Sequence, residues 1–293
     1  MGLTIRNAND ALAICEKNGW RLFETALAYE AAKGAKSKEA VFSRMEKNFA
    51  AMQDSIQTGL KGIEQGACKM FRDDAKRLMA YREKKMTLSG QTMTKAAAYA
   101  LAVMEVNCSM GRIVAAPTAG SCGVLPAVIL SSMETLQKGK TEGINALLTA
   151  GLVGVIIGKN ASLSGAEGGC QAEIGSAAAM SAAAIVEMAG GTPKQSFDAA
   201  AIALKSMLGL VCDPVAGLVE VPCAKRNSTG AAIALVSADM ALSGIPSVIP
   251  FDEVVTAMYK VGRAMPGALR ETAEGGVAAT PTGRRLKQQI FGE

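Results

Sequence analysis

Histidine is absent from this sequence of 293 residues. A histidine general base, a histidine metal ligand and any Ser-His or Cys-His catalytic pair within the chain are therefore excluded. A group that removes a proton must instead be a carboxylate, a lysine, a tyrosine, an alkoxide or a group from another chain.

Charged and aromatic residues are also scarce, at 19% and 4% of the chain, and the formal net charge is only +5. No block of lysine and arginine is interleaved with aromatic residues, which argues against a nucleic-acid-binding groove. The most apolar windows, 147–158 and 231–251, are respectively too short and too interrupted to span a bilayer, which needs about 20 residues. We therefore expect neither a nucleic-acid partner nor a membrane span.

The amino-terminal sequence has no long apolar stretch after a basic start, so we expect no signal peptide. The chain has seven cysteines, an odd number. Together with the missing export signal, this number indicates a reducing compartment and thiols or metal ligands rather than a disulfide framework. We therefore expect a cytoplasmic protein.

Helical patterns dominate the chain, whereas clean alternation and hairpin turns, the signals of strands, are poor. Two short helices are expected within 8–34, broken at Asn18-Gly19, and helical material over 38–85, broken near 59–66. Further helices are expected at 124–138, 143–159, 171–190, 195–209, 227–243 and 251–263. Alanine and glycine let helices approach closely, so the predicted fold is all-α, a compact bundle of Ala/Gly-rich helices.

The composition changes from polar to apolar near residue 88, but no repeat or low-complexity linker divides the chain. We therefore expect one catalytic domain over 1–293. In it, 1–88 would form more polar peripheral helices and 89–293 the core.

Three cysteines lie within Gly- or Pro-bearing turns, at Cys170, Cys212 and Cys223. Soft thiolates suit iron and zinc, and three protein ligands would leave one metal position open for substrate or water. The glycine-rich turn before Cys170 places that thiol at a helix start, whereas prolines beside Cys212 and Cys223 favour irregular backbone. The spacing is not a compact C-x-x-C pattern, so three buried core cysteines remain the alternative.

A second turn, Pro117 to Gly123, also opens onto a helix. Its backbone N–H groups and hydroxyls could hold a carboxylate, although an N-cap loop without a ligand has the same sequence pattern. Cys122 lies in the same loop and could be a spare metal ligand. Polar residues that stand out in the apolar half, among them Ser164 and Asn227, either bind a substrate or cap helices.

Three segments of the chain resemble the alpha chain of bacterial iron–sulfur L-serine dehydratases. They are APTAGSCGVLPAVI from Ala116, SLSGAEGGCQAEIGSAAAMSAAAIVEMAGGTP from Ser162 and GLVCDPVAGLVEVPCAKRN from Gly209. The resemblance covers most of the chain. It implies that Cys170, Cys212 and Cys223 hold a [4Fe-4S] cluster in a buried site, and that pyridoxal phosphate is not used.

The resemblance further implies deamination of L-serine to pyruvate and ammonia, with a beta subunit as partner in a hetero-oligomer. The candidate substrate-binding residues are Thr118, Ala119, Gly120, Ser121, Ser164, Gly165 and Asn227. The catalytic base is not assigned, and the missing histidine is compatible with a base from the partner chain. Two alternatives stay open, a cluster lyase acting on L-cysteine and an electron-transfer or redox-sensing iron–sulfur protein with four cysteine ligands.

Overall fold

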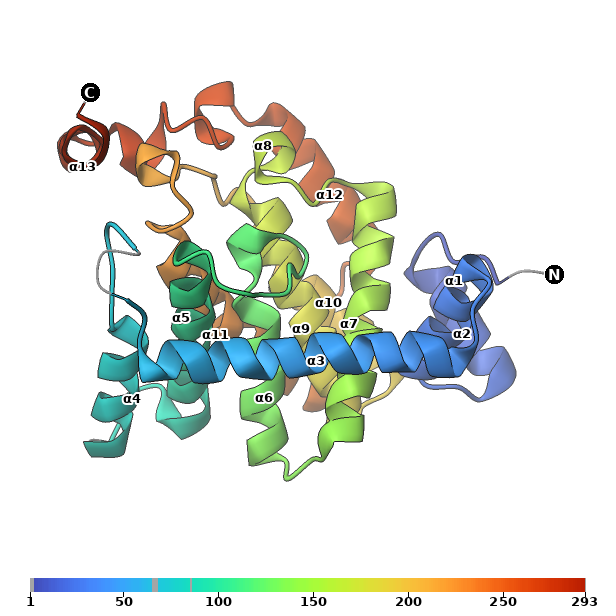
Figure 1. Ribbon diagram of the computed structural model, residues 1–293. Helices are drawn as coiled ribbons and strands as arrows, with labels where there is room; N and C mark the ends of the chain where they lie inside the picture. The colour runs from blue at the N-terminus through green and yellow to red at the C-terminus, as the bar shows by residue number, and fades with distance from the viewer. Residues whose placement is uncertain (1–2, 65–67, 85, 293) are drawn as a thin grey trace.

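A computed structural model describes residues 3–64, 68–84 and 86–292, which fold into thirteen α-helices (Figure 1). No strand forms within these ranges, although Cys212 and Arg270 make an isolated bridge. The α-helices are α1 Ala8–Asn18, α2 Leu22–Gly34, α3 Lys38–Lys61, α4 Asp74–Lys84, α5 Gly90–Cys108, α6 Val124–Thr135, α7 Lys140–Asn160, α8 Gly165–Gly168, α9 Ser176–Met188, α10 Pro193–Lys205, α11 Cys223–Leu242, α12 Phe251–Ala264 and α13 Pro281–Phe291. Five further helical turns are η1 Ala119–Ser121, η2 Gln171–Gly175, η3 Val215–Gly217, η4 Gly267–Leu269 and η5 Gly276–Ala279. The predicted all-α class is confirmed.

Local sequence signals set many of the helix ends. Gly19 adopts a left-handed conformation that ends α1, as the Asn18-Gly19 pair predicts. Thr192 caps α10, where Pro193 occupies the first helical position and Gln195 completes a capping box. These signals act between neighbouring residues, which is why they can be read before the fold is known.

The interior is built around α9, whose thirteen residues are all buried. It packs against α7, α10 and α11 (Figure 1). Small residues permit this close approach, because a Cβ added to Gly154 would lie 3.0 Å from the methyl group of Met180. An Ala-rich sequence thus yields a tightly packed centre.

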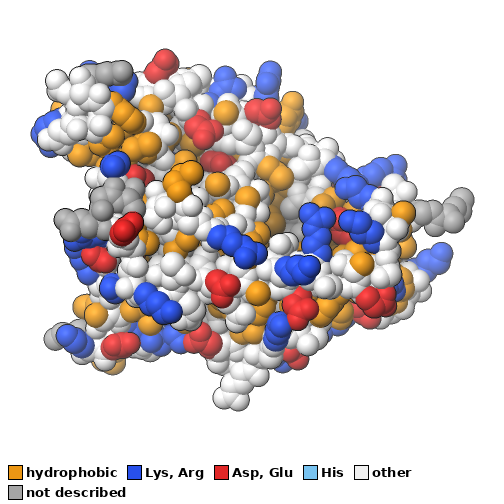
Figure 2. All heavy atoms as spheres, in the orientation of Figure 1, with side chains coloured by type: hydrophobic (Ala, Val, Ile, Leu, Met, Phe, Trp, Pro, Cys, Tyr) orange, Lys and Arg blue, Asp and Glu red, His pale blue; other side chains and the backbone are white. Residues whose placement is uncertain are grey.

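The long helix α3 crosses the front of the bundle and packs on α5 (Figure 1). Acidic and basic side chains are interspersed over its outer surface (Figure 2), which is typical of a solvated face. The division of the chain near residue 88 stays a prediction.

Helix α7 is long and apolar enough to cross a bilayer by length and composition, but 67% of its most apolar window is buried inside the protein. Its neighbours include α2, α3 and α9. This degree of burial is typical of the core helix of a globular protein.

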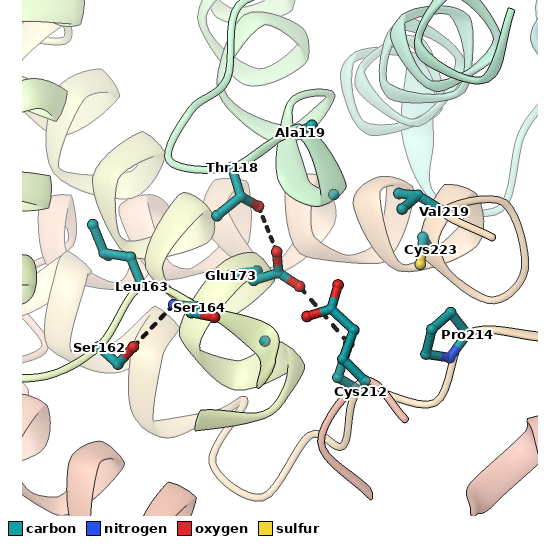
Figure 3. A pocket seen from close by; sticks show the side chains of 13 residues that line it. Thr118, Ala119, Ser162, Leu163, Ser164, Glu173, Cys212, Pro214, Val219 and Cys223 are labelled. Atoms are coloured by element: carbon teal, nitrogen blue, oxygen red, sulfur yellow. Dashed lines mark hydrogen bonds between the residues drawn. The ribbon is translucent and has the colours of Figure 1, made fainter. Parts of the chain in front are cut away.

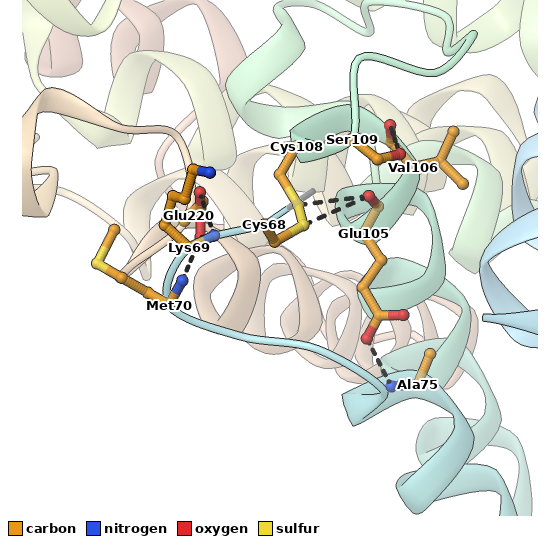
Figure 4. Close-up of a disulfide and its surroundings, with 9 residues drawn as sticks. All are labelled: Cys68, Lys69, Met70, Ala75, Glu105, Val106, Cys108, Ser109 and Glu220. Atoms are coloured by element: carbon orange, nitrogen blue, oxygen red, sulfur yellow. Dashed lines mark hydrogen bonds between the residues drawn. A yellow bond between two sulfur atoms is a disulfide. The ribbon is translucent and has the colours of Figure 1, made fainter. Parts of the chain in front are cut away.

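One expectation about the cysteines is wrong. Cys68 and Cys108 form a disulfide, whereas the other five cysteines are free (Figure 4). Their Cα atoms are 5.4 Å apart, within the range that a disulfide requires. The pair joins the segment before α4 to the end of α5, two positions whose proximity arises only from packing of the helices. Cys68 is half-buried, and Cys15 is buried.

Candidate active site

A cavity of about 530 Å³ lies where several turns meet (Figure 3). One wall is the η1 loop with Thr118, Ala119 and Gly120, and another is the segment 162–165 that leads into α8. The η2 residue Glu173 and the loop that begins at Cys212 form much of the remaining lining of the cavity. Turns distant in sequence therefore meet around one space.

Five of the seven predicted substrate-binding residues line this cavity: Thr118, Ala119, Gly120, Ser164 and Gly165. The other two do not line it. Ser121 is buried, and its hydroxyl accepts a hydrogen bond of 3.3 Å from the backbone N–H of Thr118. Direct substrate contact by any of the seven residues stays a prediction.

Asn227 lies behind the cavity wall, fully buried. Its Nδ2 donates hydrogen bonds of 2.8 Å to the carbonyl of Gly120 and 2.9 Å to that of Cys223. Its Oδ1 accepts a hydrogen bond of 2.9 Å from the N–H of Gly123. The side chain thus ties the η1 loop to the start of α11, which positions the wall of the cavity.

The sequence predicts a helix that begins at residue 227. In the structure this helix, α11, already begins at Cys223, so Asn227 and Ser228 lie inside it. The prediction of irregular backbone is therefore right for Cys212 and wrong for Cys223. Proline cannot donate a backbone hydrogen bond and is tolerated at a helix start, so Pro222 marks the beginning of α11 rather than an interruption.

The thiols of Cys170, Cys212 and Cys223 are buried and close enough to influence one another's pKa values. Cys212 and Cys223 line the cavity, and Cys170 lies directly before η2. Burial raises the pKa of Cys170 and of Cys223 to about 12 and also raises that of Cys212. Burial outweighs the helix-start effect that the sequence predicts for Cys170, so a metal must displace protons when it binds these thiols.

The three thiols can be compared with what a metal site requires. Among the described residues, no three Cys, Asp or Glu side chains are placed to hold one metal ion together. An iron–sulfur cluster does not require this arrangement, because each thiolate binds a different iron. Three buried thiols, two of which line the cavity, are donors of the type that such a cluster needs.

Cys122 does not join the three thiols at the cavity. It is fully buried, and its Sγ lies 3.7 Å from Sδ of Met104. Its neighbours are hydrophobic residues of the core around α5 and α9. This environment is typical of a core cysteine.

Glu173 is the residue that sequence reasoning missed. Its Oε1 accepts a hydrogen bond of 2.6 Å from the hydroxyl of Thr118, and its Oε2 lies 3.9 Å from Sγ of Cys212 (Figure 3). Burial raises its pKa, while the bond from Thr118 opposes this effect. The residue occupies the π-helical turn η2, a distortion that is frequent at functional sites.

Two glycines leave room for this carboxylate. A Cβ added to Gly165 would lie 2.6 Å from Oε2 of Glu173 and 3.0 Å from Sγ of Cys212, and one added to Gly120 would lie 3.1 Å from Oε1. A second carboxylate, Glu271, lines the same cavity and raises the pKa of Glu173. An acidic residue three positions after Cys170, in an otherwise uncharged stretch, was the available signal for Glu173, whereas nothing local pointed to Glu271.

Comparison with known protein families matches residues 17–278 to the family described as serine dehydratase alpha chain. The chain belongs to this family. The resemblance read from the sequence is thereby confirmed, and so is the expectation of a lyase.

Two relatives match this chain over nearly its whole length. It is 51% identical over 287 residues to the "Probable L-serine dehydratase, alpha chain" of Bacillus subtilis (strain 168), covering 98% of this chain and 95% of the relative. It is 42% identical to the "L-serine dehydratase, alpha chain" of Peptoniphilus asaccharolyticus, covering 99% of each. The "L-serine dehydratase TdcG" of Escherichia coli (strain K12) is 38% identical over 93% of this chain, which spans 61% of that longer relative.

Proposed function

We propose that this chain is the alpha subunit of an L-serine ammonia-lyase, which eliminates water from L-serine and yields pyruvate and ammonia. The observation that carries the proposal is the cavity in which Cys212 and Cys223 face the η1 loop and two carboxylates. The names of the relatives from Peptoniphilus asaccharolyticus and Escherichia coli support the same substrate.

We infer that Cys170, Cys212 and Cys223 hold a [4Fe-4S] cluster. When bound, it would supply a Lewis-acidic iron that polarises the hydroxyl of serine, a poor leaving group. The three buried thiols and the cavity beside them support this assignment.

We propose that the η1 loop binds the carboxylate of the substrate. Backbone N–H groups at a turn attract anions, and those of Ala119 and Gly120 belong to residues that line the cavity. The wall that carries Ser164 and Gly165 would orient the rest of the substrate. Asn227 keeps the loop in position through its bonds to Gly120 and Gly123.

Glu173 is our candidate for the acceptor of the α-proton. Removal of this proton together with loss of the hydroxyl group leaves an enamine, which hydrolyses to pyruvate and ammonia without further catalysis. A positioned general base typically contributes about 10² to 10⁴-fold to the rate. A base from a partner chain is the alternative, and substitution of Glu173 separates the two.

We further propose a beta subunit as partner, in a cytoplasmic hetero-oligomer. The relatives named as alpha chains, and a longer single-chain relative of which this chain spans 61%, support this proposal. If the beta subunit contributes to catalysis, co-expression should raise activity, and unchanged activity would refute this part.

The decisive experiment combines anaerobic reconstitution, iron and sulfide analysis, and pyruvate release from L-serine with and without the beta chain. We expect about four irons per chain, with pyruvate formed. The single variants Cys170→Ser, Cys212→Ser and Cys223→Ser should lose most of the iron, whereas the matched control Cys122→Ser should keep it. Absence of iron from the reconstituted protein would return the three cysteines to the core and remove the basis of the proposal.

A further inference from the structure

A second, smaller pocket of about 250 Å³ lies on the other side of α8 from the candidate active site. It is enclosed by α8, α12 and the segment that contains Arg270, and α8 lies beside α12 (Figure 1). Ser162 lines both this pocket and the active-site cavity. The two spaces are therefore neighbours separated by a single short helix and its lead-in segment.

Two guanidinium groups face this pocket, those of Arg263 at the end of α12 and of Arg270. Within the described part of the chain, neither makes an ion pair or a side-chain hydrogen bond, and Nε of Arg270 is buried without a partner. A buried donor without a partner is uncommon and calls for an explanation. Guanidinium groups pair most readily with carboxylates, which accept two parallel hydrogen bonds.

The backbone explains why Arg270 faces this pocket. Cys212 receives a hydrogen bond from Glu271 and donates one to Leu269, of 2.7 Å and 2.9 Å. Arg270 has φ −120° and ψ 67°, and Glu271 takes a left-handed φ of 65°, so the chain turns between the two residues. Glu271 accordingly lines the active-site cavity, and Arg270 lines the smaller pocket.

We propose that this pocket binds a small carboxylate through Arg263 and Arg270. The inference rests on the proposed function in one respect, because the substrate and the product of that reaction are both small carboxylates. A bound carboxylate would hold Arg270, and with it the segment that pairs with Cys212. The concentration of such acids would therefore affect how firmly the wall of the active site around Cys212 is held.

The chemistry leaves two sources of the carboxylate, a 2-oxo acid and an amino acid. Glu167 also lines the pocket and accepts a hydrogen bond from Ser162. Its carboxylate would attract the ammonium group of an amino acid, which a 2-oxo acid lacks. Pyruvate and L-alanine are suitable probes, because L-alanine has no β-hydroxyl group and cannot undergo the proposed elimination.

The test is calorimetric titration of the full chain with pyruvate and with L-alanine at fixed ionic strength. Arg263→Gln and Arg270→Gln should each weaken binding about tenfold, the typical effect of losing a charge-assisted hydrogen bond. Arg263 is exposed, so its variant tests the pocket even where Arg270→Gln disturbs folding. Arg284→Gln removes an exposed charge from α13 and should leave the affinity unchanged. Thr118→Val tests whether the ligand occupies the active-site cavity instead.

Stronger binding of L-alanine would identify the amino acid as the ligand class, and stronger binding of pyruvate the 2-oxo acid. Equal affinity in the wild type and both arginine variants would refute the proposal, as would a lack of saturable binding. Loss of binding only in Thr118→Val would place the ligand in the active-site cavity and refute this pocket while leaving the proposed function intact. Conversely, a chain without elimination activity can still show the arginine-dependent binding.

Discussion

The hydroxyl of Thr118 donates a hydrogen bond of 2.6 Å to Oε1 of Glu173, across 55 residues of sequence. This bond joins the loop proposed to bind the substrate carboxylate to the carboxylate proposed to accept the proton. It also opposes the rise in the pKa of Glu173 that burial causes. The two residues therefore act as one unit at the cavity.

Replacement of Glu173 tests the proton acceptor. We expect Glu173→Gln to lower kcat about 10² to 10⁴-fold, because the amide keeps the shape but cannot accept the proton. Iron content and thermal unfolding should change little. Glu253→Gln, at an exposed position of α12, is the control. Wild-type kcat in Glu173→Gln would exclude Glu173 as the base and leave Glu271 or a residue of a partner chain.

Substitution of glycines beside Glu173 tests whether its carboxylate needs the open space around it. Gly165→Ala places a Cβ 2.6 Å from Glu173 and 3.0 Å from Cys212, so it should strongly reduce kcat/KM, while Gly120→Ala, with 3.1 Å, should have a smaller effect. Gly151 in α7 has open space around it, and Gly151→Ala should raise stability by about 0.5–1 kcal/mol. Steady-state kinetics and urea unfolding measure both effects, and equal kinetics for the three variants would contradict this account of the cavity.

Asn227 should behave as a positioning residue. Asn227→Ala removes three hydrogen bonds to the backbone and should lower the free energy of unfolding by about 3 kcal/mol, at roughly 1 kcal/mol per bond. The neighbouring Ser228→Ala removes one bond, to the carbonyl of Ala97, and should cost about 1 kcal/mol. Wild-type stability of Asn227→Ala in urea, with only KM for serine raised, would instead favour direct substrate contact.

Glu105 should make stability depend on pH. The residue is fully buried, its Oε2 has no partner, and burial raises its pKa above the unfolded value. The folded state therefore binds the proton more tightly, and this contribution to stability is present below the unfolded pKa and is lost as pH rises through the folded pKa. Thermal unfolding should show that Glu105→Gln gains stability relative to wild type as pH rises through this interval. A difference that is independent of pH would contradict the assignment.

The disulfide can be detected by a count of reactive thiols and removed by substitution. Protein unfolded without reductant should show five reactive thiols, because Cys68 and Cys108 are paired. The two cysteines are 40 residues apart, so the chain-entropy model gives about 4 kcal/mol of stabilisation. Reductant should lower the Tm of the wild type but not of the double variant Cys68→Ser/Cys108→Ser, and seven reactive thiols would show that the pair is reduced.

Local patterns predicted most helices to within a few residues. The expected helix 251–263 corresponds to α12, Phe251–Ala264, and the expected helix 143–159 to α7, Lys140–Asn160. Periodicity and turn residues act over short distances, so they can be read without knowledge of the fold. The π-helical start of the expected helix 171–190 could not be read in this way, because an inserted residue leaves the apolar pattern almost unchanged.

The amino-acid sequence by itself determined the all-α class, the exclusion of histidine chemistry and the motifs that carry the family resemblance. Only the tertiary structure decided that Glu173 and Glu271 share a cavity, that Asn227 holds its wall from behind, and that Cys68 meets Cys108. The physical reason is the range of the interactions. Helix formation depends on neighbours along the chain. A site is assembled by packing between segments that are far apart in the sequence, and separation along the sequence does not determine their distance in space.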